Sequence, residues 1–118
     1  MQKTVAIVFS AIGFLAASLA FAQSFPAKPI RIVSTFQPGV IDGPLRAMTQ
    51  KMSESMGQPV VIEVQAGAGG VIGAQAVLRA APDGYTMLFT STGTIVTTPY
   101  LLKNKPYEPI DFTPISAA

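Results

Sequence analysis

Three glycine-bearing loops are the segments of this sequence best suited to chemistry. They cover residues 37–43, 65–70 and 91–94, and most of their side chains are short. Backbone N–H groups can therefore approach a ligand closely in each loop. Two of the loops lead into a predicted helix, whose first turn offers unpaired N–H groups and the positive end of the helix dipole. This pattern predicts recognition of an anion such as a carboxylate, without any charged side chain.

Simpler interpretations of the same residues stay open. Glycine-rich turns between a strand and a helix also occur only because the chain must bend sharply. Asp42 is interpreted as a helix cap rather than an acid catalyst, because no second carboxylate lies near it in the sequence. Arg46 follows four residues later and is spaced to form an ion pair with Asp42.

The composition argues against an enzyme. The chain has 118 residues with no His and no Cys, which excludes Ser-His-Asp and Cys-His hydrolases, disulfides and Cys-type zinc sites. Residues 67–73 resemble a dinucleotide fingerprint, but Ile72 stands where its third glycine belongs. A G-K-[ST] phosphate loop is absent from the sequence. We therefore expect no catalytic residue, no cofactor and no metal.

Alternating strands and helices position the three loops. Runs rich in β-branched and aromatic residues predict strands at 30–36, 59–64 and 85–90. Helical periodicity falls between them, at 44–56 and 72–80. This order predicts an α/β fold of βαβαβ type, with a parallel sheet, right-handed crossovers and helices on both faces. Ligands of such sheets bind outside the carboxyl ends of the strands, where the three loops lie.

The first predicted helix carries clear local signals. Asp42 or Gly43 is placed to cap its start, and Gly57 to end it in the left-handed conformation. A stripe of methionines recurs along it at helical spacing, and we expect this stripe to pack in the core. Its members are Met48, Met52 and Met56.

Residues 1–22 have the three parts of a secretory signal peptide. Lys3 supplies the positive start, an uncharged apolar run follows, and Ala20 and Ala22 give the small-residue pattern for cleavage after Ala22. We expect a periplasmic mature chain, residues 23–118. Loss of Lys3 leaves seven basic and six acidic residues, a balance that predicts no nucleic-acid partner.

Several blocks follow one another in a familiar order. They are 28–33 (KPIRIV), 36–39 (FQPG), Asp42, Arg46, 57–61 (GQPVV), 67–74 (GAGGVIGA), 80–86 (AAPDGYT), 106–109 (PYEP) and 111–116 (DFTPIS). Together they resemble the opening of the Bug-type solute receptors, the extracytoplasmic binding proteins of tripartite tricarboxylate transporters. The resemblance implies a two-lobed, hinged periplasmic-binding fold that captures a small carboxylate between its lobes, with membrane transporter subunits as partners. We expect a monomer.

The resemblance also implies which residues hold the ligand. Main-chain amides of the loop after the first strand would bind the carboxylate, and the loop after the third strand would add contacts. The corresponding residues are Gly39, Val40, Ile41, Asp42, Ser91, Thr92, Gly93 and Thr94. The block 67–70 would then be architectural. The first loop is one residue shorter than the family pattern, which shifts the direction of its N–H groups.

Length is the larger departure from the family. Its members run to about three hundred residues, whereas residues 23–118 correspond to part of the first, N-terminal lobe. We therefore expect a truncated form with weak or no ligand binding. The alternative function is a sensory or partner-binding lobe that presents a surface to a membrane protein.

Overall fold

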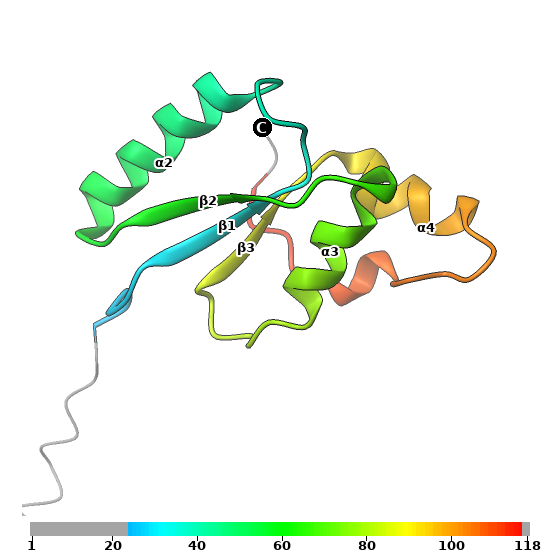
Figure 1. Cartoon of the computed structure of the whole chain (residues 1–118). Helices are drawn as coiled ribbons and strands as arrows, with labels where there is room; N and C mark the ends of the chain where they lie inside the picture. The colour runs from blue at the N-terminus through cyan, green and yellow to red at the C-terminus, as the bar shows by residue number, and fades with distance from the viewer. Residues whose placement is uncertain (1–23, 117–118) are drawn as a thin grey trace, which may run out of the picture.

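The computed structural model describes residues 24–116, and the expected signal peptide lies outside the described residues. Figure 1 shows an open sheet with helices around it. In chain order the elements are β1 (Ile30–Ser34), α2 (Asp42–Met56), β2 (Val60–Val64), the 3-10 turn η1 (Ala68–Gly70), α3 (Val71–Leu78), β3 (Thr86–Phe89), the π-type turn η2 (Gly93–Thr97), α4 (Thr98–Leu101) and the 3-10 turn η3 (Pro109–Asp111).

The three strands form one parallel sheet in the order β2-β1-β3. Ile30 pairs with Val60 in one ladder, and Arg31 pairs with Thr86 in the other. The central strand is the most enclosed element, because it has a neighbour on each side: Ile32 is 3 % exposed and Val33 is fully buried. The parallel α/β sheet predicted from the sequence is confirmed.

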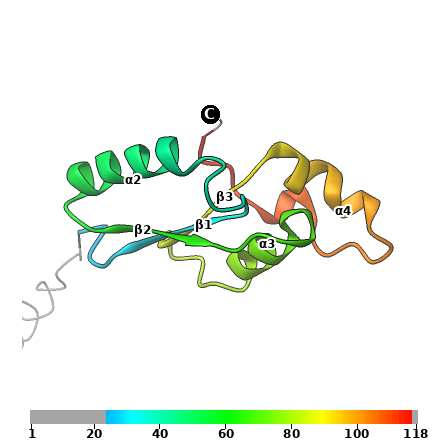
Figure 2. The same ribbon diagram turned by 45° about the horizontal axis from the view of Figure 1, so that its top comes forward.

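The two crossover helices lie on opposite faces of the sheet (Figure 2). α2 packs mainly against β2, whereas α3 packs against β3 and β1. Opposite faces follow from the strand order, because the crossover from β1 to β2 and the crossover from β2 past β1 to β3 run in opposite directions across the sheet. Right-handed crossovers that run in opposite directions lie on opposite faces.

The ends of α2 were predicted only in part. Gly57 ends the helix as expected, with a left-handed φ of 66° and its N–H donating to the Ser53 carbonyl at 3.0 Å. The predicted cap was wrong: Ile41 precedes the first turn, and no side chain caps it. The expected pair between Asp42 and Arg46 is also not among the ion pairs of residues 24–116.

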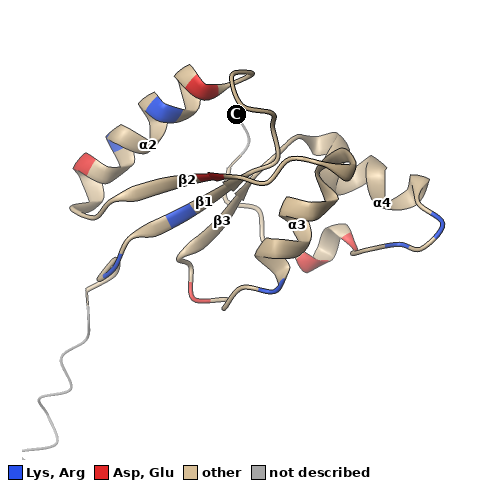
Figure 3. Cartoon of the chain, in the orientation of Figure 1, with Lys and Arg blue, Asp and Glu red and all other residues tan. Residues whose placement is uncertain are grey.

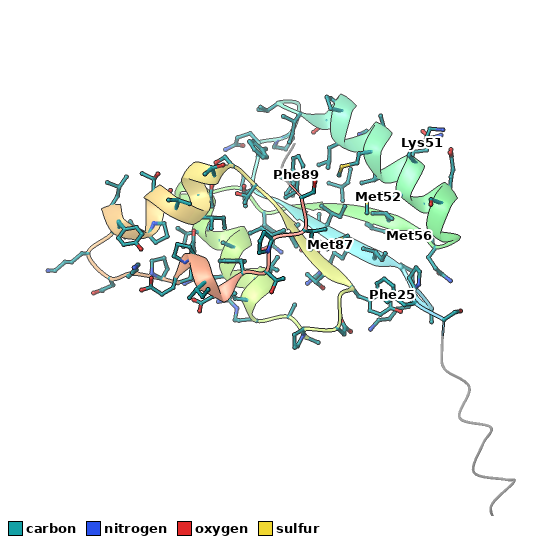
Figure 4. All side chains as sticks on the ribbon, turned by 180° about the vertical axis from the view of Figure 1, so that it is seen from behind. Phe25, Lys51, Met52, Met56, Met87 and Phe89 are labelled. Atoms are coloured by element: carbon teal, nitrogen blue, oxygen red, sulfur yellow. The ribbon has the colours of Figure 1, made fainter. Side chains whose placement is uncertain are left out.

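The methionine stripe of α2 is not core, contrary to expectation. Leu45 and Thr49 are the buried residues of the helix, whereas Met48 and Met56 are each 37 % exposed. Figure 4 shows Met52 and Met56 on the same side of the sheet as Met87. Because α2 lies over β2 at the edge of the sheet, its methionine side is only half enclosed.

The other face of the sheet carries a small closed core. Val71 and Ala74 of α3 pack with Tyr107 of the tail, and Leu88 and Phe112 flank them. The Tyr107 and Phe112 rings meet edge to face, with centroids 5.4 Å apart. The tail after α4 therefore returns to the sheet and takes part in its packing. Among residues 24–116, no helix combines the length and apolar character that a membrane crossing requires.

Candidate functional site

The topology favours ligand binding at the end of the sheet where the strands have their carboxyl ends. The chain leaves β1 on one side through α2 to β2, while β3 lies on the other side of β1. The loops after β1 and β3 therefore diverge, which opens a crevice at the carboxyl ends of the strands. The two loops begin side by side, because the hydroxyls of Thr35 and Thr90 lie 2.6 Å apart.

A hollow of about 440 Å³ lies at this edge. All three glycine-bearing loops contribute to its lining: Thr35, Phe36, Gln37, Ala66, Gly67, Ala68, Gly69, Gly70, Ser91 and Thr94. None of these side chains is charged. A negatively charged ligand here would be held by main-chain N–H groups, hydroxyls and the Gln37 amide.

Strained backbone lines one wall of the hollow. Ala68, Gly69 and Gly70 have consecutive positive φ angles of 48°, 64° and 90°. Ala68 is the one non-glycine residue with positive φ in the described part of the chain, a conformation that costs free energy and persists only where neighbours enforce it. A Cβ on Gly70 would lie 2.5 Å from Thr94 Cγ2 and 2.6 Å from Thr94 Oγ1. The glycine block therefore packs closely against Thr94 and also lines the hollow.

Thr94 ties the second and third loops together. Its backbone N–H donates to the Ser91 carbonyl at 3.1 Å, and its hydroxyl donates to the Gly69 carbonyl at 3.1 Å. Its own carbonyl accepts a hydrogen bond of 2.6 Å from the Tyr107 hydroxyl. Burial raises the pKa of Tyr107, so this hydroxyl remains a protonated donor at neutral pH.

The predicted ligand residues fall into two groups. Ser91 and Thr94 line the hollow, and Thr92 and Gly93 belong to the same exposed turn. The first loop is placed differently. Gly39, Val40 and Ile41 precede α2 outside the lining of the hollow, and Asp42 lines a separate groove with Arg46 between α2 and β2.

Main-chain amides of the first loop remain relevant to an anion. The Val40 N–H is directed to the Gln37 carbonyl at 3.3 Å. The first helical bond of α2 runs from the Leu45 N–H to the Ile41 carbonyl at 3.1 Å. The N–H groups of Asp42 and Gly43 therefore have no acceptor within the helix, as in every first turn.

Sequence reasoning missed Thr35, Phe36 and Tyr107 as site residues. Thr35 and Phe36 were assigned to the first strand, but β1 ends at Ser34, so both residues belong to the crevice. The available signal was Pro38, since a strand rarely continues up to a residue that cannot donate. Tyr107 lies 13 positions from the residue whose carbonyl it contacts, and no local sequence pattern predicts that hydrogen bond.

No charged residue is among those that line the hollow. Figure 3 marks the positions of the Lys, Arg, Asp and Glu residues along the described chain. Lys28 and Asp83 pair at 3.0 Å near the amino ends of the strands, where Lys28 also lies over the Tyr85 ring. The hydrogen bond from Lys28 holds the pKa of Asp83 below its usual value. Among residues 24–116, no cluster of three or more His, Cys, Asp or Glu side chains could hold a metal ion.

Comparison with known proteins identifies this architecture. Residues 45–117 match the model of the tripartite tricarboxylate transporter family receptor. A UPF0065 protein of Bordetella pertussis is 40 % identical over 86 % of this chain and 32 % of its own length. Protein BugT of the same organism is 36 % identical over 98 % of this chain and 37 % of its own length.

Two solved structures share the fold. The periplasmic binding protein BugD has a TM-score of 0.65 and 41 % identity, over 72 % of this chain and 28 % of BugD. MatC of Rhodopseudomonas palustris, solved with bound malate, has a TM-score of 0.67 and 37 % identity, over 76 % of this chain and 31 % of MatC. The fold is that of part of a periplasmic binding protein.

The chain belongs to the tripartite tricarboxylate transporter receptor family, as its sequence blocks suggested. This is a family of solute-binding receptors rather than enzymes, and its members include periplasmic binding proteins. The chain spans about a third of the length of the curated relatives it matches.

Proposed function

We propose that this chain forms part of the receptor of a tripartite tricarboxylate transporter and captures a small carboxylate for uptake. The observation that carries the proposal is the hollow at the carboxyl ends of the strands, lined by three glycine-bearing loops and no charged side chain. Malate bound to MatC and adipate bound to a second relative of Rhodopseudomonas palustris support a carboxylate as the ligand class.

The same proposal covers location and partners. Residues 1–22 direct export, cleavage follows Ala22, and the mature chain acts in the periplasm as a monomer. Membrane subunits of the transporter receive the solute. The ligand contacts are the amides of Gly39, Val40, Ile41 and Asp42 together with the turn of Ser91, Thr92, Gly93 and Thr94.

We further propose that residues 23–118 by themselves bind the carboxylate weakly or not at all. The hollow is lined from one sheet edge only, so a small ligand would remain partly hydrated, and tight binding of small molecules requires burial of most of their surface. We expect dissociation constants of about 1 mM or weaker for this segment.

Isothermal calorimetry with malate, adipate, citrate and glutamate tests the weak-binding part. A micromolar constant for the 118-residue chain would contradict the weak-binding part. For the receptor part, Ser91→Ala is compared with Ser55→Ala, an exposed position on α2 away from the hollow, in a saturation titration followed by NMR. Malate should shift the amide signals of residues 91–94 in Ser55→Ala and less so in Ser91→Ala. Shifts confined to other regions would refute the site.

The alternative of a sensory lobe has its own outcome. Deletion of the gene should abolish uptake of the carboxylate if the receptor role holds. Altered signalling with uptake intact would instead support a lobe that presents its surface to a membrane protein.

A further inference from the structure

The turn that follows β3 has a backbone pattern that leaves one carbonyl without its usual donor. η2 is π-type, so the N–H of Thr98 bonds the carbonyl of Gly93, five residues earlier. The next bond of this pattern would run from residue 99 to the carbonyl of Thr94. Residue 99 is Pro99, which has no N–H.

Tyr107 supplies the missing hydrogen bond from outside the turn. Its hydroxyl donates to the Thr94 carbonyl at 2.6 Å, and both residues are buried, at 5 % and 6 % exposure. A buried carbonyl that lost this donor would be left unsatisfied, which is more costly than the loss of an exposed bond. The Tyr107 ring is itself fixed by Phe112 and the side chains of α3.

Thr94 connects the Tyr107 hydrogen bond to the residues that line the hollow. Its side chain contacts Gly70 so closely that a Cβ there would overlap it, and its hydroxyl donates to the Gly69 carbonyl. The Ser91 hydroxyl lies 3.2 Å from that of Thr94. A displacement of Thr94 would therefore move both the Ser91 turn and the strained glycine wall.

We infer that Tyr107 is a positioning residue of the ligand site: its hydroxyl holds the Thr94 carbonyl and so fixes the third loop against the glycine block. The inference rests on the proposed function for its consequence in binding, but the positioning itself is measurable without any ligand.

Hydrogen exchange in the full chain, followed by NMR, provides the ligand-free test. Tyr107→Phe keeps the ring and removes the hydroxyl. Tyr85→Phe is the matched control, because its hydroxyl accepts a bond from Ala27 at the amino ends of the strands. We expect exchange of the Thr94 amide, whose N–H donates to the Ser91 carbonyl, to rise at least about tenfold in Tyr107→Phe and to stay unchanged in Tyr85→Phe. Equal exchange in the two variants would overturn the inference.

A second variant separates hydrogen bonding from packing. Pro99→Ala restores an N–H at the position from which the π-type turn would satisfy Thr94. In the Tyr107→Phe background it should slow exchange of the Thr94 amide back toward the wild-type rate, whereas in the wild-type background it should leave that rate unchanged. If the two substitutions instead speed amide exchange additively in the double variant, Tyr107 acts through packing alone and the inference is overturned.

The binding test uses malate as the probe. If the wild-type chain shows malate-dependent amide shifts, Tyr107→Phe should weaken them at least about fivefold at a given malate concentration, a coupling of roughly 1 kcal/mol, and Tyr85→Phe should not. Equal weakening by both variants would remove the role of Tyr107 in binding. Absence of any malate effect in the wild-type chain would count against the proposed ligand, while the exchange experiment would still decide the positioning.

Discussion

Gly73 gives the sharpest test of how α3 is seated on the sheet. A Cβ at this position would lie 2.9 Å from the Gln65 carbonyl oxygen, 2.9 Å from Thr35 Cγ2 and 3.3 Å from Val33 Cγ1. Gly73 is buried in the first turn of α3, and its conformation suits any residue. Gly73→Ala therefore tests close approach alone, without backbone strain.

Two effects of opposite sign decide the magnitude. Replacing Gly by Ala inside a helix stabilises it by about 1 kcal/mol. Overpacking of a closed contact costs about 1–3 kcal/mol, and here the upper part of that range applies, because a backbone carbonyl cannot rotate away as a side chain can. We expect a net loss of about 1–2 kcal/mol.

Urea unfolding followed by circular dichroism measures the loss, with Gly43→Ala as the matched control. Gly43 lies in the first turn of α2, and a Cβ there would meet nothing within 4 Å. Gly43→Ala should leave the free energy of unfolding unchanged or raise it by up to about 1 kcal/mol. Equal midpoints for the two variants, or a higher one for Gly73→Ala, would refute the close approach of α3 to β1.

Two further changes test the glycine wall and the amino-terminal ion pair. Gly70→Ala combines a φ of +90° with overlap against Thr94, so it should lower the free energy of unfolding by about 3 kcal/mol or more; a thermal melt that matches the wild type would contradict this. Asp83, whose pKa is held below its usual value by Lys28, should stabilise the fold above its ordinary pKa, with the contribution lost as the pH falls through the lowered value. The stability difference between wild type and Asp83→Asn should therefore shrink as the pH falls below about 5, and a difference independent of pH would exclude the ion pair as its source.

The sequence predicted the elements that local chemistry determines. Gly57 ends α2 because its left-handed φ is compatible with few other residues. The β-branched runs became the three parallel strands, because alternation with helices of this length permits few other pairings. The placement of Ser91 and Thr94 at the carboxyl edge followed from the same topology.

What the sequence could not predict depends on contacts between distant segments. Periodicity placed Met48 and Met56 on one side of α2, but whether that side is enclosed depends on which strand the helix lies over. Asp42 matched the composition of a cap, yet the helix began one residue too early for its side chain to serve. The bond from Tyr107 to Thr94 depends on a π-type turn that is followed by a proline. Residue spacing alone does not predict this combination.

The strand order has a consequence for the sequence in which the strands can pair during synthesis and folding. A chain that emerges amino end first presents β1 before either of its neighbours exists. Ion-pair partners on β1 and β2 are 32 positions apart, and the hydroxyls that meet after β1 and β3 are 55 apart. The most buried strand must wait the longest for its second neighbour, so slow, non-local pairing exposes this protein to aggregation at its centre rather than at its edges.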